Sequence, residues 1–345
     1  AAFAYWNTLQ ELTLRRRLCR QLLKNIQVAL QCPEVASAGL AGTFQGPLMD
    51  VLKQALEQPQ KVGLSLFGTA VDIVSNLIQD DASRVPQLIS SGILPRLVAV
   101  LNKQTMRSVE CLSNVPGVLG SIALHSSGEE FLFESPHKPL ELLTSTLVDP
   151  SFTPIFHSAQ ELSSSMGSSM DEILRHRPQS RLTDTVVSSA VAALGSLLAD
   201  AQRYPAWVIG SSGDDATEHL AHRLAHVGRF LDCLLGNENT MKAFTASDGH
   251  QLLRQLVSSP CLPYNLMCFP HGHPLQAVFR ILSTFCGKDA QSVAEEMLVE
   301  ATTQIVQARS AIASSSLLGM SDPIAVLRDV SHEQLDGFLR PLSKL

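Results

Sequence analysis

Three histidines in one short stretch have a spacing that could serve metal chemistry. His219, His222 and His226 lie in a helical pattern, and the last two are four residues apart, which is about one helical turn. Such a pair can bind zinc, but no glutamate follows the first histidine and no third ligand is evident. At roughly 100° per residue the three share one helix face, away from the leucines. We therefore expect a polar face turned to solvent or to a partner, with a metal-dependent hydrolase as the minor alternative.

A second group of metal-binding residue types lies in a proline-rich segment. It comprises Cys261, Cys268, His271 and His273, in the pattern C-x6-C-x2-H-x-H. Structural zinc modules favour two cysteines separated by about two to four residues, which this pattern lacks. The sequence therefore favours ordinary packing of a connecting segment over a zinc site.

Templates for other catalytic chemistry are absent from the sequence. Gly287 and Lys288 are followed by Asp289 and lack the earlier glycine of a phosphate-binding loop. There is also no dinucleotide-binding glycine pattern and no serine-hydrolase elbow. The 26 basic and 32 acidic residues give a net charge of -6, so no positive field attracts nucleic acid. We expect no catalytic residue, no cofactor and no nucleic-acid partner.

The composition indicates which elements must carry these side chains. Hydrophobic residues make up 45% of the 345 residues and aromatic residues only 5%, a balance typical of helices packed on helices. The longest apolar stretch, residues 186–199, is interrupted by polar residues and is shorter than the ~20 residues of a membrane span. The seven cysteines are odd in number and mostly lie in apolar patterns, typical of reduced thiols. We expect an all-α protein without a membrane span, in the cytoplasm, the nucleus or both.

A recurring unit organises the chain. Each copy has a long helix, a polar stop, a short helix, a glycine or proline break and a leucine-rich amphipathic helix. The stops at Asp80 and Ser126 are 46 residues apart, and those at Asn237 and Gly287 are 50 apart, close to armadillo and HEAT repeats. This spacing predicts an armadillo/HEAT-like α-solenoid of stacked helical hairpins and triplets, with a non-repetitive helical bundle as the alternative. The first helix of each copy is indicated by apolar residues, in residues 64–78 for the first copy, at Val115, Leu119 and Ile122 for the second, and at Leu224, Val227, Leu231 and Leu234 for the third.

Breaks in the pattern suggest the division of the chain. Residues 149–167 resemble a loop or a shortened helix, and four prolines exclude a helix interior from residues 258–274. A helical pattern returns from Ala290 to about Ser315. The predicted segments are N-terminal helical repeats at 1–62, armadillo-like repeats at 63–203, an exposed linker at 204–217, and armadillo-like repeats with C-terminal helices at 218–345.

Several motifs resemble a known family. They cover about residues 64 to 290, in the family's order, and include Ser91-Gly92-Ile93-Leu94-Pro95, Asn114-Val115-Pro116-Gly117, Asp171-Glu172-Ile173-Leu174-Arg175-His176-Arg177-Pro178 and Ser259-Pro260-Cys261-Leu262-Pro263-Tyr264. Together they resemble the N-terminal armadillo-like region of the giant HECT-type E3 ubiquitin ligases, the Mule/Tom/Upl group.

This resemblance implies a role without catalysis. In the family, the catalytic cysteine belongs to a C-terminal HECT domain, which we expect to be absent from this chain. Cys286 lacks the family's Thr-Cys-x-Asn arrangement and is expected to be a core thiol. The implied function is a scaffold segment that serves substrate or partner recognition in ubiquitination. Its partners would be protein substrates or adaptors and the remaining solenoid and HECT domain of the same parent chain.

The main alternative is a free-standing armadillo-repeat adaptor for transport or assembly. Importin-type grooves use tryptophan and asparagine arrays on the third helix of each repeat. The third helices expected here, Leu94 to Leu101, Leu140 to Leu147 and Gln251 to Val257, contain neither residue type, which weighs against this alternative.

Overall fold

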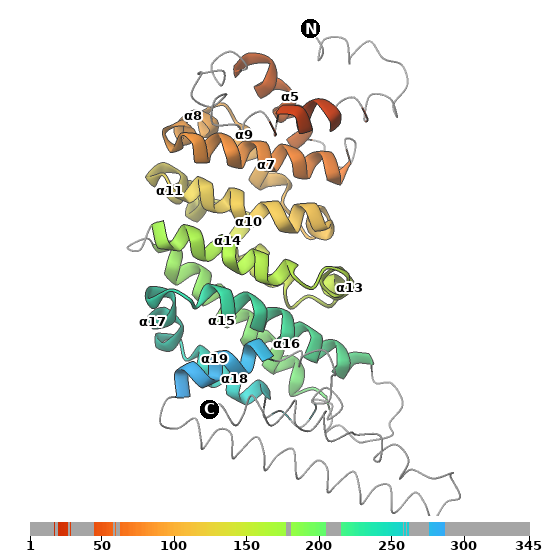
Figure 1. The fold of residues 1–345 in the computed structure, drawn as a ribbon, viewed down its shortest axis with the longest axis vertical. Coiled ribbons are helices and arrows are strands. Elements are labelled where there is room, and N and C mark those ends of the chain that lie inside the picture. Colours follow the sequence, from red (N-terminus) through yellow and green to blue (C-terminus); the bar gives the residue numbers. More distant parts are fainter. Residues whose placement is uncertain are drawn as a thin grey trace, which may run out of the picture. The chain divides into compact units, whose positions relative to one another are not determined.

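The computed structural model describes residues 17, 20–26, 28, 45–57, 59, 63–176, 181–204, 215–257, 259, 261 and 276–286. In these residues all regular secondary structure is α-helix or 3-10 helix (Figure 1). The prediction of an all-α, solenoid-type protein is therefore confirmed. The chain divides into two units, residues 1–146 with 168–186 and residues 147–167 with 187–345.

Unit 1 contains two successive helical triplets that match the first two predicted copies. Gly92 precedes α9 with φ 80°, a left-handed conformation that glycine adopts without strain. The Ser108 hydroxyl caps α10 by accepting a hydrogen bond from the Cys111 amide. The triplets are α7 (Leu64–Asp80), α8 (Val85–Ser90) and α9 (Ile93–Val100), then α10 (Val109–Ala123), α11 (Ser126–Glu134) and α12 (Pro139–Thr146), with α5 (Gln45–Glu57) before them and the 3-10 turns η1 (Ala82–Arg84) and η2 (Thr105–Arg107) between.

The core of unit 1 lies between the first helices of the two triplets, α7 and α10. Apolar side chains recur along both helices with helical spacing and are buried, among them Phe67, Val74 and Leu119. Asn114 Nδ2 donates to the carbonyl oxygen of Gly68 at 3.0 Å, and these two residues are 46 positions apart. The spacing of the sequence repeat is thus the register in which the two helices pack.

Unit 2 contains the third predicted triplet and the helices that pack on it. The triplet is α16 (Asp215–Leu234), α17 (Glu238–Ala246) and α18 (Gly249–Val257). α19 (Gln276–Cys286) packs against α16 at Gly228, where a Cβ would lie 2.4 Å from Val278 Cγ2. The unit also contains η3 (Pro150–Phe152) and α13 (Thr153–Ser158), while α14 (Leu162–His176) and α15 (Arg181–Ala201) have residues in both units.

Two predicted irregular segments differ from expectation. In residues 149–167, η3 and α13 are short helices as expected, but α14 already begins at Leu162. Pro150 and Pro154 fit here because each lies in the first turn of its helix, where a missing amide hydrogen leaves no bond unmade. The predicted linker 204–217 lies outside the described residues except for 204 and 215–217, and α16 already begins at Asp215.

Other predicted segments fall on residues that the structure does not describe. These are residues 290–315 and most of 1–62 and of 258–274. The predicted segment boundaries remain predictions.

The helix α15 is the one described helix long and apolar enough to cross a membrane by length and composition alone. Its buried residues, such as Leu182, Val186, Ala190 and Leu197, recur with helical spacing. The core helix of a soluble protein meets the same criteria, so they are weak evidence for a span. The absence of a membrane span remains a prediction.

Candidate functional site

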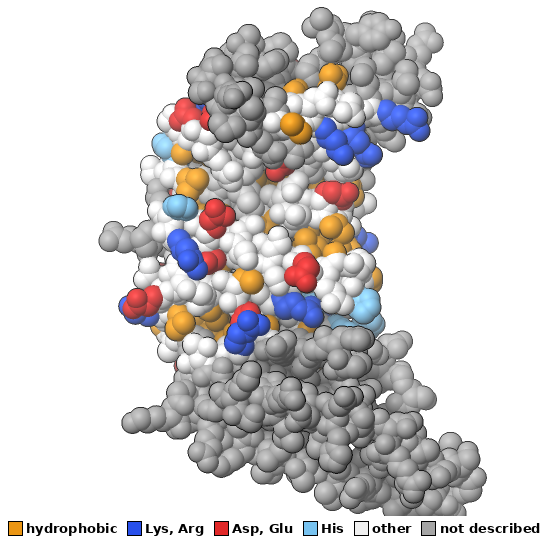
Figure 2. Space-filling view, viewed as in Figure 1, with side chains coloured by type: hydrophobic (Ala, Val, Ile, Leu, Met, Phe, Trp, Pro, Cys, Tyr) orange, Lys and Arg blue, Asp and Glu red, His pale blue; other side chains and the backbone are white. Residues whose placement is uncertain are grey.

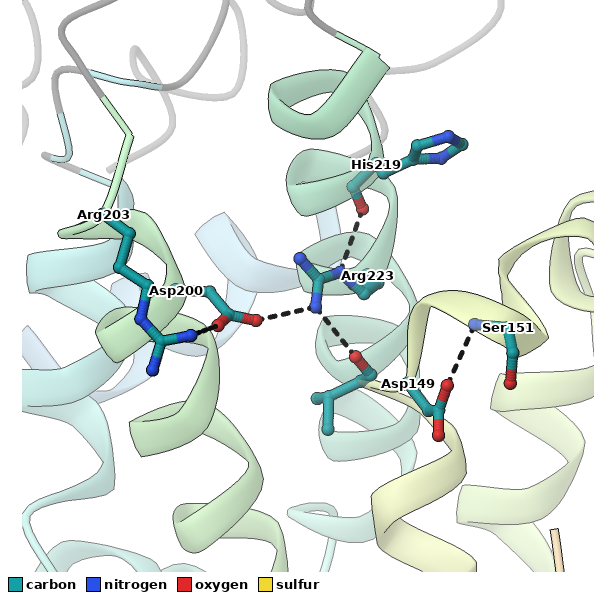
Figure 3. A network of polar contacts seen from close by, with 7 residues as sticks. Asp149, Ser151, Asp200, Arg203, His219 and Arg223 are labelled. Carbon is teal, nitrogen blue, oxygen red and sulfur yellow. Dashed lines mark hydrogen bonds and ion pairs between the residues drawn. The ribbon is translucent and has the colours of Figure 1, made fainter.

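A buried arginine lies at the centre of a polar network in unit 2 (Figure 3). Arg223, on α16, has a side chain that is only 4% exposed. Its Nη1 donates to Asp200 Oδ2 at 2.9 Å and to the carbonyl oxygen of Val148 at 3.0 Å, and its Nε donates to the carbonyl oxygen of His219 at 3.4 Å. A buried guanidinium is tolerated only when it is paired and hydrogen-bonded. This network therefore stabilises the charge and joins three segments.

The joined segments are the last turn of α15, the chain before η3, and α16. Asp200, at the end of α15, also accepts a hydrogen bond from Arg203 Nη1 at its Oδ1, at 3.3 Å. Immediately after Val148, the Asp149 carboxylate accepts a hydrogen bond from the Ser151 amide at 2.9 Å and so caps η3. Because α13 follows η3 directly, the network ties the chain that leads into α13 to α16.

A second contact between α13 and α16 consists of aromatic rings. The Phe156 ring lies 5.1 Å from the His226 ring, between centroids, with the planes tilted by 30°. The neighbouring pair, His157 and His222, meets edge to face, with centroids 5.5 Å apart and planes at 77°. The two segments therefore meet through one buried and one more exposed ring pair.

His226 is a neutral core residue. It is 2% exposed, and its Nδ1 accepts a hydrogen bond from Arg229 Nη1 at 3.3 Å. Its Nε2 has no hydrogen-bond partner among the described residues. Burial, helped by the charges of Arg229, His222 and His157, lowers the pKa of His226 from 6.5 to about 3. The imidazole is therefore uncharged near neutral pH.

The predicted histidine face is thus corrected in part. His219 is exposed and His222 is partly buried, but His226 is buried. The expectation was wrong for His226 because it assumed one covered side of α16, whereas α13 covers the side that carries this residue. No group of three or more His, Cys, Asp or Glu side chains in the described part of the chain could hold a metal ion. His157, which completes the ring pair, was missed because it lies in a segment without a clear periodic pattern.

Two cysteines of the described residues, Cys111 and Cys261, are buried, and Cys233 is partly buried. Burial raises the pKa of the Cys111 thiol to about 11 and also raises the pKa of the Cys261 thiol. Since a thiol nucleophile requires a lowered pKa, neither environment activates its cysteine. Cys268, His271, His273 and the side chain of Cys286 lie outside the described residues, so the expectations for them remain predictions.

Known proteins match this chain over much of its length. A family model described as Domain of Unknown Function (DUF913) matches residues 10–211 and 208–265. E3 ubiquitin-protein ligase HUWE1 of Mus musculus is 26% identical over 191 residues, which are 53% of this chain and 4% of the relative. E3 ubiquitin-protein ligase UPL2 of Arabidopsis thaliana is 21% identical over 349 residues, 89% of this chain and 9% of the relative.

A fungal relative is also an E3 ubiquitin-protein ligase. E3 ubiquitin-protein ligase TOM1 of Saccharomyces cerevisiae is 27% identical over 135 residues, 39% of this chain and 4% of the relative. The chain therefore spans less than a tenth of the length of each of these relatives. The resemblance to the Mule/Tom/Upl group of ligases is confirmed.

Proposed function

The chain belongs to the family described as Domain of Unknown Function (DUF913), and from this membership we propose that it is a non-catalytic scaffold segment of a HECT-type E3 ubiquitin ligase. In this role it presents a surface of stacked helices to protein substrates or adaptors. The rest of the solenoid and the catalytic domain would belong to the same parent polypeptide.

The extent of the match to UPL2 is the observation that carries this proposal. The alignment covers 89% of this chain but only 9% of the ligase. A chain of this kind corresponds to one part of a very long protein, and the chemistry of the whole can lie elsewhere in it. Repeat proteins use such parts as extended binding surfaces, because each stacked unit adds a further row of exposed side chains.

The polar side chains of the described helices support a scaffold role. Asn76 Nδ2, on α7, donates to Asp72 Oδ2 at 3.2 Å, and Asn114, on α10, donates to the Gly68 carbonyl. The side chain of each asparagine is therefore hydrogen-bonded inside unit 1. On the face shown in Figure 2, acidic and basic side chains are interspersed, without a field of one sign. A surface of this kind suits protein partners better than a phosphate backbone.

We also propose a location in the cytoplasm, the nucleus or both. Cys111, Cys233 and Cys261 are free thiols in the described residues, which suits a reducing compartment.

A ubiquitin-transfer assay tests the absence of catalysis. The 345-residue chain is incubated with ubiquitin-activating enzyme, a charged ubiquitin-conjugating enzyme and ATP. We expect no ubiquitin adduct that disappears with dithiothreitol. Such an adduct on this chain would overturn the proposal, because a thioester would place the catalytic cysteine here.

A deletion in the parent polypeptide tests the recognition role. Removal of residues 63–286 should leave self-ubiquitination intact, because the catalytic domain remains, and should change which cellular proteins carry ubiquitin. An unchanged set of ubiquitinated proteins would contradict the recognition role. A parent polypeptide without a ubiquitin-transfer domain would instead support the free-standing adaptor.

A further inference from the structure

One exposed helix face in the N-terminal part of unit 1 carries three basic side chains. Residues 17, 20–26 and 28 are helical, and Arg17, Arg20 and Lys24 are exposed. Their spacing of three and four residues places successive side chains on the same side of a helix. Leu23, roughly 100° around the helix from Lys24, is fully buried. The helix thus packs on the protein through its apolar side and turns these three bases, here called the basic face, to the outside.

The charges of the basic face are not neutralised by neighbouring side chains. None of Arg17, Arg20 and Lys24 forms an ion pair or a hydrogen bond with another described residue. By contrast, the exposed Lys138 pairs with Glu141 at 2.9 Å. The chain as a whole has a net charge of -6, so three unpaired bases on one face are a local exception. Unpaired exposed charges attract a partner of opposite charge and orient it on the surface.

An exposed apolar side chain lies beside the basic face. Val28 is 67% exposed, the more exposed of the two large hydrophobic side chains found at the surface of the described residues. It follows Lys24 by four residues, which is about one helical turn further along the same side. A partner that combines carboxylates with an apolar side chain would therefore complement both features of this surface.

Other anionic partners fit this surface less well. A helix bound to a membrane inserts a wide apolar face between the lipids, whereas the apolar side of this helix carries Leu23, which is buried in the protein. Affinity for nucleic acid grows with the number of phosphates that are neutralised, and only three bases share the face. A polypeptide can place several carboxylates and an apolar side chain over the roughly 17 Å of helix between residues 17 and 28.

We propose that the basic face, together with Val28, is a docking surface for an acidic polypeptide segment. Carboxylates of the segment pair with the three bases, and an apolar side chain of the segment covers Val28. This inference goes beyond the proposed scaffold role, because the surface would serve a ligase segment and a free-standing adaptor alike. Its failure would leave the scaffold role untouched.

Peptide binding to the full chain tests the proposal. The probe is a fluorescein-labelled peptide of repeated Glu-Glu-Leu, and its matched control has glutamine in place of glutamate. We expect fluorescence anisotropy to rise with the acidic peptide only, and the affinity to fall as salt is added. Arg20→Gln and Lys24→Gln should each weaken binding by about 1.5- to 5-fold, and Arg17→Gln/Arg20→Gln/Lys24→Gln by roughly tenfold. Val28→Ser should weaken it by about three- to tenfold, because less apolar surface is buried.

A matched variant separates the basic face from exposed bases elsewhere. Lys138→Gln removes a base that is paired with Glu141 and should bind the acidic peptide as the unaltered chain does. All these substitutions are at exposed positions, so the far-UV circular dichroism should stay unchanged. Absence of binding, equal affinity of the triple variant and the unaltered chain, or an equal loss in Lys138→Gln would refute the proposal. Tighter binding to phosphatidylserine vesicles or to duplex DNA, lost in the triple variant, would also refute it.

Discussion

Ser75 and Ser121 share a hydrogen bond of 3.0 Å between their hydroxyl oxygens, and they occupy equivalent positions, 46 residues apart, on α7 and α10. Both side chains are buried. Gln79 Nε2 also donates to Ser121 Oγ at 3.1 Å, and Ser121 Oγ donates to the Gly117 carbonyl at 2.8 Å. Two repeats are thus held in register by a small polar network inside an otherwise apolar contact.

The serine network predicts a coupled effect on stability. Ser121→Ala should destabilise the fold by about 1 to 3 kcal/mol, because it leaves the buried Ser75 hydroxyl without its partner. The double variant Ser75→Ala/Ser121→Ala should cost less than the sum of the two single variants, since both polar groups are then gone. Urea unfolding of the four chains measures this coupling. Additive effects would show that the two hydroxyls do not interact.

Two helical glycines predict opposite responses to alanine. A Cβ at Gly167 would lie 2.3 Å from the Phe230 carbonyl oxygen, a backbone atom that cannot easily move. Gly167→Ala should therefore destabilise the protein by about 1 to 3 kcal/mol, although alanine is the better helix former.

The matched control is Gly195→Ala, on α15. A Cβ there meets nothing within 4 Å, so the substitution should stabilise by about 0.5 to 1 kcal/mol through the helix preference alone. Thermal unfolding of both variants measures the difference. An equal shift in the same direction would mean that α14 and α16 do not approach as closely as the geometry indicates.

The buried arginine predicts a large cost on removal. Arg223→Met removes the donor to the Val148 carbonyl and one of the two arginines that pair with Asp200, which keeps Arg203 and is 27% exposed. Loss of these charge-assisted hydrogen bonds from a buried donor should cost about 1 to 3 kcal/mol. Arg203→Ala removes the second arginine that pairs with Asp200. The Arg203 side chain is 76% exposed, so this substitution should change the free energy of unfolding by less than about 0.5 kcal/mol. The free energies of unfolding in urea test this contrast. Similar costs for both would contradict a central role of Arg223.

The buried histidine predicts a pH dependence with a definite sign. Burial lowers the pKa of His226 to about 3 from its ordinary value of 6.5, so between these values the unfolded chain binds the extra proton. Folding stability should therefore fall as the pH drops below 6.5, by at most about 1.4 kcal/mol per pH unit from this residue.

Replacement of the histidine should remove that contribution. His226→Leu should flatten the decline between about pH 6.5 and pH 3, because the side chain that binds a proton only in the unfolded chain is gone. The free energy of unfolding, measured in urea at several pH values, gives the slopes. An unaltered slope in His226→Leu would show that this imidazole titrates alike in the folded and unfolded chains.

Local patterns explain which parts of the fold were predictable. The apolar spacing of residues 64–78 predicted α7, and the equivalent spacing near Val115 predicted α10, because the side chains along a helix determine which face is buried. The segment around α13 was less clear, since its turns depend on caps such as Asp149 and on prolines in first turns. The His157/His222 pair was missed because the two residues are 65 positions apart and no local pattern connects them.

By itself the sequence determined the helices, their repeat of 46 residues and the likeness to the giant ligases, since all three depend on the order and spacing of residues along the chain. Only the tertiary structure decided that His226 is buried, that Arg223 joins three segments, and that His157 meets His222. A helical wheel describes one helix alone, whereas burial depends on every element around it. On α16, contacts with both α13 and α19 cover more of the surface than the periodicity of one helix can indicate.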